Sequence, residues 1–553
     1  AAHRFFPKLI EDWDIERIIN DYADAAERMQ AGGMDGIEIE AYGHLMDQFW
    51  SPLSNELNGP YGVGSLKNRM QFSIDVLSAV RKRVGPDFIV GIRLVGDEAE
   101  QGGLTANEGF QIAKTLADDE LVDFLNVIRG RVHSDPALVD VIPVQGMKSA
   151  PHLDFAGAIK AEIGLPTFHA ARIPDVATAR HAVSSGLLDM VGMTRAHMAD
   201  PHIVRKIMEG REDDIRPCVG ATYCLDRIYE GGEALCIHNP STGRELIQPH
   251  DIAPSQTPKT VVIVGAGPAG LEAARVAAER GHSVTLFEAA SDAGGQIRLT
   301  AQTPRRREMM SIIDWRMAQC AARDVHFHFN TWAEASDITA LAPDIVIIAT
   351  GGVPHMRLYE NTKDQDLAIS AWDILSGDVK PANRMLIFDA AGDHAGLQAA
   401  EIAALAGSTV EIMTPDRSFA PEIKGMNLVP YMRTLQDKDV TFTVTRRLKG
   451  ITRDGNQLCA QIGTDYSDLV QDKHYDQIVV NYGTQPNADL YFDLKPHARN
   501  LGQVDYDALI QGQPQTIVKN NNGAFDLFRI GDAVSSRNTH AAIYDALRLV
   551  RTL

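Results

Sequence analysis

The feature of this sequence that most constrains its fold is the turn at Gly265–Gly270, which reads GAGPAG. The apolar segment TVVIV leads into the turn, a helical segment follows, and the apolar segment VTLFE then ends in Glu288. Gly265 permits the tight bend, Gly267 lets the backbone approach a pyrophosphate, and Gly270 lets helix and strand pack closely. The helix N-terminus faces the phosphates, and Glu288 accepts from a ribose hydroxyl. The pattern predicts a Rossmann-like domain that binds an ADP moiety; the alternative is a glycine-rich loop without a ligand.

Three later positions are predicted to contact the same dinucleotide. Gly351 lies in the turn ATGG at the end of a predicted strand, and Asp532 lies in the turn IGDA before a helix, where it would bind a ribityl or ribose hydroxyl. Gly295 is the third of these predicted contacts. Because such turns are common for steric reasons, it is their order after the GAGPAG turn that favours a role in binding.

A second βαβ unit at residues 384–414 lacks the clean glycine pattern. Its turn, Asp389–Gly396, reads DAAGDHAG, so the first Gly is missing and both Asp389 and Asp393 would repel a pyrophosphate. No Arg cluster suited to a 2′-phosphate follows residues 413–416. We therefore predict weak or no NAD(P)H binding at this turn. The alternative is a divergent turn that still binds a nicotinamide nucleotide.

Residues 13–217 alternate strand and helix patterns, which predicts a parallel sheet. Short apolar strands with polar residues at their C-terminal ends are typical of a (β/α)8 barrel. Five strands are visible where a barrel has eight, and the chain starts at Ala1 without Met, so we expect the first three strands to precede it; the alternative is an open doubly wound sheet. The predicted strands are 36–40, 88–94, 122–128, 166–171 and 188–193, and the predicted helices are 14–31, 67–84, 106–118, 155–163, 174–185 and 201–209.

The sequence thus predicts an α/β chain in which a barrel, lacking its N-terminal strands, precedes Rossmann-like domains. The predicted segments are the barrel at 1–217, a Cys segment and linker at 218–258, the first part of an FAD/ADP-binding domain at 259–383, a second nucleotide-binding-like domain at 384–500, and a return to the first at 501–553.

Composition excludes several classes of function. The formal net charge of −20 disfavours nucleic acid and anionic membrane surfaces as partners. No apolar run reaches the roughly 18 residues that a transmembrane helix needs. Five cysteines in 553 residues do not make a disulfide framework and favour a reducing, cytoplasmic location.

Three of the cysteines lie close together in the sequence, at Cys218, Cys224 and Cys236. Thiolates at this spacing suit an iron–sulfur cluster or zinc. Because a four-iron cluster normally has four Cys ligands, His238 or solvent would complete the site, or the cluster would hold three irons. The alternative is a set of buried thiols that bind no metal.

Polar side chains gather at the predicted C-terminal ends of the barrel strands, where active sites of this fold lie. If the visible strands are the fourth to eighth, Arg172 and Arg195 fall in the phosphate-binding loops. Arg93 would lie over a flavin pyrimidine and stabilise a reduced, anionic ring. For each side chain a surface or salt-bridged role is the alternative. The full set is Glu40, Tyr42, His44, Arg93, Arg129, Arg131, His133, Asp135, His169, Arg172, Thr194 and Arg195.

These motifs together resemble a known family. The string DGIEIEAYGHLMDQFWSP at 35–52, the LKNR string at 66–69, and the MTR and ADP strings at 193–201 are similar to the old-yellow-enzyme barrel. Barrel, Cys segment and dinucleotide domain in this order resemble the trimethylamine dehydrogenase and 2,4-dienoyl-CoA reductase group. The resemblance implies FMN in the barrel, a 4Fe-4S or 3Fe-4S iron–sulfur cluster on the Cys segment, and FAD or ADP in the following domain.

Within the group, the chain looks most similar to bacterial demethylases of dimethylglycine, proline betaine and N-methylproline. The string CVGATYCLDRIYEGGEALCIHNP at 218–240 carries part of that similarity. Two departures matter. Residues 40–44 read EAYGH where the reductases carry a His-rich string that binds the ligand carbonyl, and Ala221 replaces the second cluster Cys.

The resemblance implies an oxidative N-demethylase for a small N-methylated amine or amino acid. A substrate methyl group would give a hydride to FMN, the iminium would hydrolyse to formaldehyde, and electrons would leave through the cluster to an electron-transfer-flavoprotein-like acceptor or partner subunit. Tyr42 and His44, with Glu40 or Asp135, would orient or deprotonate the amine. A substrate carboxylate would be held by Arg129, Arg131 or Arg172.

Two other functions compete with this prediction. One is an NAD(P)H-dependent 2,4-dienoyl-CoA or enoate reductase; the other is an electron-transfer subunit with a degenerate active site. Retention of Tyr42, His44, Arg93 and Arg195 argues against the second. In each case we expect a homo- or hetero-oligomer.

Overall fold

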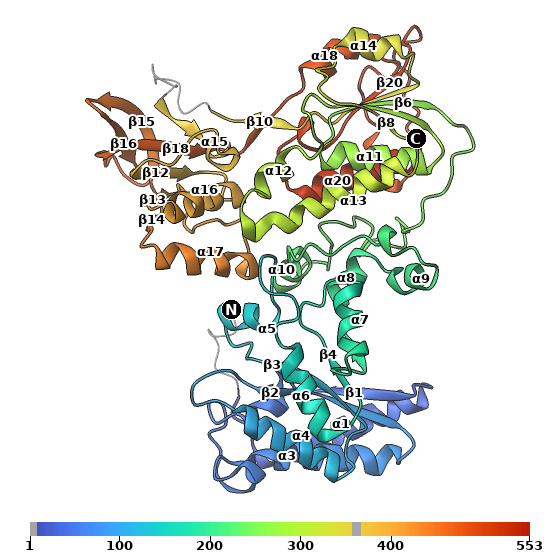
Figure 1. The fold of residues 1–553 in the computed structure, drawn as a ribbon, viewed down its shortest axis with the longest axis vertical. Coiled ribbons are helices and arrows are strands. Elements are labelled where there is room, and N and C mark those ends of the chain that lie inside the picture. Colours follow the sequence, from blue (N-terminus) through green and yellow to red (C-terminus); the bar gives the residue numbers. More distant parts are fainter. Residues whose placement is uncertain (1–7, 357–366) are drawn as a thin grey trace. The chain divides into compact units, whose positions relative to one another are not determined.

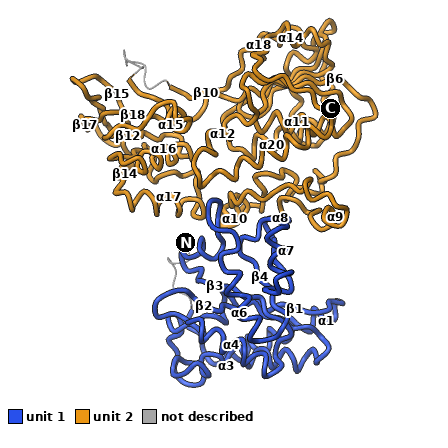
Figure 2. Tube along the Cα trace, viewed as in Figure 1, with its two compact units in different colours: residues 1–197 blue, residues 198–553 orange. Residues whose placement is uncertain are grey.

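A computed structural model describes residues 8–356 and 367–553 of the chain. These residues form two compact units, residues 1–197 and 198–553, which are shown in different colours in Figure 2 and are described separately below. Within the described ranges, no helix combines the length and apolar character that a bilayer crossing requires.

The first unit contains a parallel sheet whose five strands follow one another in chain order, β1-β2-β3-β4-β5. Strand β2 pairs in parallel with both neighbours, with Ile39 opposite Ile92 and Ile92 opposite Leu125. The predicted parallel sheet of βα units is therefore confirmed. The strands are β1 (Gly36–Glu40), β2 (Ile89–Asp97), β3 (Phe124–Arg129), β4 (Thr167–His169) and β5 (Met190–Val191).

Helices alternate with these strands, and local sequence signals set their ends. Thr105 and Glu108 form a capping box at the start of one helix, and Ser65 accepts from the Asn68 N–H at the start of another. The helical segments are α1 (Asp12–Ala31), α2 (Leu45–Trp50), η2 (Gly59–Tyr61), α3 (Leu66–Val84), α4 (Ala106–Asp118), α5 (Asp135–Val141), α6 (Leu153–Ile163) and α7 (Val176–Ser184), with α8 (Thr194–Ala199) across the boundary between the units.

The second unit contains a five-stranded parallel sheet in the order β20-β9-β6-β7-β8. Strand β9 and residues 261–264 of β6 are buried, and helices α11, α13 and α20 lie side by side along the sheet (Figure 1). The C-terminal strand β20 returns to this sheet by pairing with β9. The elements are β6 (Thr260–Val264), α11 (Pro268–Glu279), β7 (Ser283–Phe287), α12 (Gln296–Thr300), η4 (Pro304–Met310), α13 (Ser311–Ala321), β8 (His326–His328), α14 (Ala335–Ala340), β9 (Ile345–Ile348), α18 (Asp489–Leu494), η6 (Lys495–His497), α19 (Tyr506–Gln511), β20 (Asp526–Arg529), η7 (Gly531–Ala533) and α20 (Thr539–Val550).

Another five-stranded parallel sheet, in the order β11-β18-β12-β13-β14, forms the centre of what we call the second lobe, residues 369–481. A three-stranded antiparallel sheet, β15-β16-β17, packs beside it. The elements are β11 (Ile369–Ser370), α15 (Ala371–Ser376), β12 (Arg384–Asp389), α16 (His394–Leu405), β13 (Thr409–Met413), α17 (Gly425–Asp437), β14 (Thr441–Thr443), β15 (Arg447–Asp454), β16 (Gln457–Gly463), β17 (Gln471–Tyr475) and β18 (Gln477–Asn481); the pair β10 (Gly352–Pro354) and β19 (Thr484–Pro486) flanks the lobe.

The Cys segment packs onto helices α11 and α13 of the second unit through a buried group of charges. Glu272 and Arg316 are both fully buried; Arg316 Nε donates to Glu272 at 2.8 Å, and Arg275 Nη2 donates to it at 2.7 Å. Arg316 also donates to the carbonyl of His238 at 3.0 Å. The short helical elements of this region are α9 (Ile203–Met208), η3 (Glu212–Asp214) and α10 (Tyr223–Tyr229).

Replacing Glu272 with Gln is expected to destabilise the second unit by about 3–5 kcal/mol, because the fully buried Arg316 loses its counter-charge and Arg275 keeps only Glu279. The matched control is Glu279→Gln, whose partly exposed carboxylate bonds Arg275 at 2.6 Å and should cost about 1 kcal/mol or less. Urea unfolding of each variant measures the difference. Equal losses in the two variants would show that burial of Glu272 is unimportant.

Candidate functional site

The turn at Gly265–Gly270 places three glycines in three different environments. Gly265 has a φ of +105°, and a Cβ there would lie 2.4 Å from the Ala349 carbonyl oxygen. A Cβ on Gly270 would lie 1.8 Å from the Gly265 carbonyl oxygen, so this glycine is required by packing between helix and turn. At Gly267, by contrast, a Cβ would meet no atom within 4 Å. The fold therefore needs Gly265 and Gly270, whereas the open space at Gly267 leaves room for a ligand.

A cavity of about 840 Å³ opens over this turn. Its wall includes Gly267, Gly295, Gly351 and Asp532, so the structure brings these predicted contacts to one place. Asp532 accepts from Gln296 Nε2 at 3.0 Å. The volume falls within the range of cofactor pockets, roughly 300–1,000 Å³.

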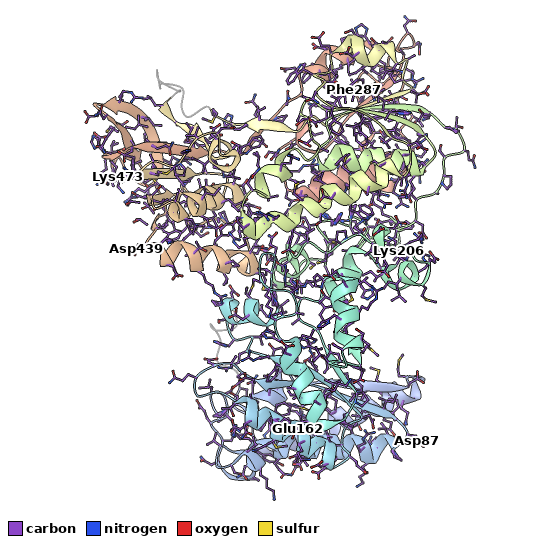
Figure 3. The ribbon with its side chains drawn as sticks, viewed as in Figure 1. Asp87, Glu162, Lys206, Phe287, Asp439 and Lys473 are labelled. Atoms are coloured by element: carbon purple, nitrogen blue, oxygen red, sulfur yellow. The ribbon has the colours of Figure 1, made fainter. Side chains whose placement is uncertain are left out.

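Glu288 is held at the same cavity by the backbone. It follows Phe287, the last residue of β7, which is labelled in Figure 3. Its two carboxylate oxygens accept the N–H groups of Ala266 at 2.7 Å and of Ala290 at 2.8 Å. Trp332, which is 75% exposed, also lines the cavity and was not singled out from the sequence. An indole face in a cavity wall beside a ribose acceptor is suited to stacking on a base.

The second turn is filled by the chain's own carboxylates. Asp389 Oδ1 accepts the N–H groups of Ala391 at 3.2 Å and Gly392 at 3.0 Å, and Asp393 accepts the N–H of Ala395 at 2.9 Å. These N–H groups are the donors that a pyrophosphate would need. Burial, together with the Asp393 carboxylate, raises the pKa of Asp389 to about 7. The geometry gives a physical basis for the predicted weakness of NAD(P)H binding here.

In the first unit, Glu40, Tyr42 and Arg93 lie together at the carboxyl end of β1, where Glu40 pairs with Arg93 in the middle of β2. Arg93 Nη1 lies 3.1 Å from Glu40 Oε2, and the Arg93 guanidinium lies 5.9 Å from the centre of the buried Tyr42 ring. Burial raises the pKa of Glu40. In the described part of the chain, Glu40 Oε1 and Arg93 Nε are buried without a hydrogen-bond partner. A carboxylate and a guanidinium with unused bonding capacity are suited to binding a polar ligand.

Asp47 belongs to this region but was missed by sequence reasoning. It accepts the N–H of Gly43 at 2.5 Å, and so holds the loop that carries Tyr42 and His44. Burial raises the pKa of Asp47 to about 7. The only sequence signal was an Asp three residues beyond His44, which is equally typical of a helix start.

The predicted phosphate-binding residues follow the carboxyl ends of β4 and β5. Arg172 is buried, has a φ of +48°, and donates from Nε to the Met147 carbonyl at 3.0 Å. Arg195 Nη1 donates to the Pro143 carbonyl at 2.9 Å, and Thr194 begins α8. His169 on β4 is buried, with Nδ1 2.7 Å from the Val127 carbonyl oxygen, and burial lowers its pKa to about 4.

Other predicted side chains are already paired or exposed. Arg129 Nε lies 2.9 Å from Asp97, and Arg131 forms ion pairs with Glu98 and Glu100. His44 and Asp135 are both solvent-exposed, Asp135 at the first turn of α5. The ion pairs of Arg129 and Arg131 reduce their capacity to hold a substrate carboxylate, and the contacts give no support for Asp135 in the site.

The three thiols of the Cys segment do not form a recognisable metal site in the structure. Among residues 8–356 and 367–553, no group of three or more His, Cys, Asp and Glu side chains is placed to hold a metal ion. Cys236 Sγ nevertheless accepts the backbone N–H groups of His238 and Asn239 at 3.4 Å each, although burial raises the pKa of this thiol. Cys218, Cys224 and Cys236 thus stay predicted ligands of a cluster.

Comparison with known proteins identifies the family. Residues 1–214 match the model of the NADH:flavin oxidoreductase / NADH oxidase family, and residues 259–546 match that of pyridine nucleotide-disulphide oxidoreductases. A probable N-methylproline demethylase of Rhizobium meliloti (strain 1021) is 65% identical over all of this chain and 81% of its own length. This chain belongs to the NADH:flavin oxidoreductase / NADH oxidase family. The resemblance to the flavin-dependent amine dehydrogenase and reductase group is therefore confirmed.

Two further relatives extend the comparison. The N,N-dimethylglycine/sarcosine dehydrogenase of Chromohalobacter salexigens is 44% identical over 100% of this chain and 81% of that protein. The solved structure of a 2-naphthoyl-CoA reductase in complex with 2-naphthoyl-CoA has a TM-score of 0.84 at 27% identity, over 99% of this chain and 77% of that one. The predicted fold class, a flavin barrel followed by a dinucleotide-binding module, is confirmed by the family matches.

Substituting Gly267 with Ala tests the nucleotide cavity. Its φ of −73° suits Ala and the added Cβ meets no protein atom, so we expect normal stability but at least about tenfold weaker nucleotide retention. Gly270→Ala is the contrasting variant, and should instead impair folding. Acid extraction after gel filtration measures the bound nucleotide. A full complement of nucleotide in Gly267→Ala would place the phosphates elsewhere.

Proposed function

We propose that this chain is a flavin-dependent oxidative N-demethylase. Its substrate is a small N-methylated amine or amino acid, such as N-methylproline or dimethylglycine. The observation that carries the proposal is the high identity, over the whole chain, to a probable N-methylproline demethylase. The carboxylate-filled second turn supports it independently, since an enzyme that takes its electrons from an amine needs no NAD(P)H site.

FMN is the cofactor proposed for the first unit. Arg93 would face the flavin ring, while Arg172, Thr194 and Arg195 would hold the phosphate. The partnerless Arg93 Nε fits a ligand with acceptor atoms. When bound, FMN supplies the hydride acceptor for a substrate methyl group, after which the iminium hydrolyses to formaldehyde and the demethylated amine.

The residues around this position have distinct proposed roles. Glu40, whose Oε1 is buried and unpaired among the described residues, takes the proton that the amine must lose. The Tyr42 ring packs against the cationic or N-methyl end of the substrate. Asp47 fixes the loop that presents Tyr42 and His44.

Further components remain part of the proposal. The cavity over Gly267 would take FAD or ADP, and Cys218, Cys224 and Cys236 would hold an iron–sulfur cluster. The proposed electron acceptor is an electron-transfer-flavoprotein-like protein or partner subunit. Because these three thiols lack a fourth Cys, no catalytic step is assigned to the cluster. Iron and sulfide assays, with nucleotide identification after acid extraction, test these components. We place the enzyme in the cytoplasm, as a homo- or hetero-oligomer.

The second candidate is an NAD(P)H-dependent enoate reductase, which is favoured by the structural similarity to 2-naphthoyl-CoA reductase. Anaerobic mixing separates the two functions. We expect N-methylproline or dimethylglycine to bleach the flavin absorbance and to release formaldehyde, whereas NADH leaves the flavin oxidised. Rapid bleaching by NADH, with none by any N-methylated amine, would establish the reductase instead.

Demethylation should also depend on the ionisation of Asp47. Below pH of about 7 its carboxyl is protonated; above that, the carboxylate accepts the Gly43 N–H more strongly and holds the loop more firmly. We therefore expect kcat/KM to rise as the pH increases through about 7, and Asp47→Asn to remove that rise. Asp87→Asn, at an exposed position of the same unit (Figure 3), is the control. An unchanged profile in Asp47→Asn would assign the ionisation to another group.

A further inference from the structure

The second lobe has the fold of a nucleotide-binding domain, yet its own side chains occupy the turn where a nucleotide would bind. It keeps a nucleotide-binding type of fold, with a parallel sheet and the helix α16 after its turn, but Asp389 and Asp393 occupy the donors of that turn. A lobe that is predicted to bind a pyrophosphate weakly or not at all is expected to contribute to the protein in another way.

The lobe makes a buried contact with the Cys segment through Asn427, on the first turn of α17. The Asn427 Nδ2 group lies 2.8 Å from the Ala221 carbonyl oxygen, 2.8 Å from Thr222 Oγ1 and 2.9 Å from Asp226 Oδ2, and it shares its two protons among these three acceptors. All four residues are buried. The Met426 backbone N–H also donates to Asp226. The start of α17 therefore bonds a carboxylate and a carbonyl of the Cys segment.

The segment that Asn427 contacts is strained. Thr222 has a φ of +52°, in the left-handed region that a β-branched residue rarely adopts. It caps α10, the helix that carries Cys224, and its hydroxyl donates to the Ala221 carbonyl at 2.9 Å. Bonds from Asn427 to both sides of this residue offset the strain and so fix the path between Cys218 and Cys224.

The other end of the Cys segment is held by helices α13 and α20, which cover the β20-β9-β6-β7-β8 sheet. His540 on α20 has its Nδ1 2.8 Å from the Cys236 carbonyl oxygen, and Arg316 on α13 donates to the His238 carbonyl at 3.0 Å. Each end of the segment thus has its own anchor, and the anchor near Cys218 and Cys224 comes from the second lobe.

We propose that the second lobe serves to position the Cys218–Cys224 loop, and that Asn427 is the positioning residue. The geometry of the loop stands without a metal, whereas its consequence for a cluster rests on the proposed function. Loss of the Asn427 amide leaves the Ala221 carbonyl and the Asp226 carboxylate buried without this donor, which favours opening of the loop.

Hydrogen exchange of the intact protein tests the proposal. In Asn427→Ala, peptides covering 218–226 should exchange at least about tenfold faster than in the wild type, while peptides covering 259–288 keep their protection. Gln436→Ala, at an exposed position of the same helix, should change neither. Unchanged protection at 218–226 in Asn427→Ala overturns the proposal.

A second variant guards against general misfolding. Thr222→Gly removes the cost of the positive φ, so the double variant Thr222→Gly/Asn427→Ala should regain part of the protection at 218–226. Faster exchange everywhere in Asn427→Ala, without recovery in the double variant, means that Asn427 supports the whole fold and also overturns the proposal.

The consequence for a cluster has its own readout. If the wild-type protein contains iron and sulfide, Asn427→Asp should lower the iron content or shift the cluster's midpoint potential, with the FMN content unchanged and Gln436→Ala normal in both. The same potential and iron content in Asn427→Asp overturn this part. A wild-type protein without iron defeats the proposed cluster, while the exchange experiment still decides the role of Asn427.

Discussion

The second unit depends on a single buried carboxylate. Glu272 lies on the helix that follows the GAGPAG turn, and it neutralises two guanidinium groups at once. Because Arg316 also binds the His238 carbonyl, the same ionic group joins the nucleotide turn's helix to the Cys segment. Such an arrangement tolerates no loss of one member, since the others would stay buried and charged. The helix that follows the nucleotide turn and the Cys segment are thereby packed together through buried charges.

Much of this architecture was accessible from the sequence, because local patterns determine it. Alternating apolar strands and amphipathic helices predict the parallel sheets, and glycine spacing at 265–270 predicts a turn in which two of the three glycines are sterically required. The aspartates of the second turn were also readable, since their chemistry opposes a phosphate wherever the side chains point.

What the sequence could not provide were partners far apart in the chain. Nothing near Asn427 indicates that its amide binds the loop at Ala221, some two hundred positions earlier. Likewise, Arg131 looks like a free cation until Glu98 is placed beside it, and Asp47 looks like an ordinary helix start until burial raises its pKa. These properties arise from tertiary packing, which no local pattern encodes.

The filled second turn has a consequence for how such an enzyme coexists with cellular metabolism. Reduced and oxidised nicotinamide nucleotides are abundant, and an open site for them would let a flavin exchange electrons with that pool in either direction. Carboxylates supplied by the chain itself accept the N–H groups of the turn that such a nucleotide would need. For a demethylase, the turn would keep nicotinamide nucleotides from exchanging electrons with the flavin, so that electrons taken from an amine reach only their intended acceptor.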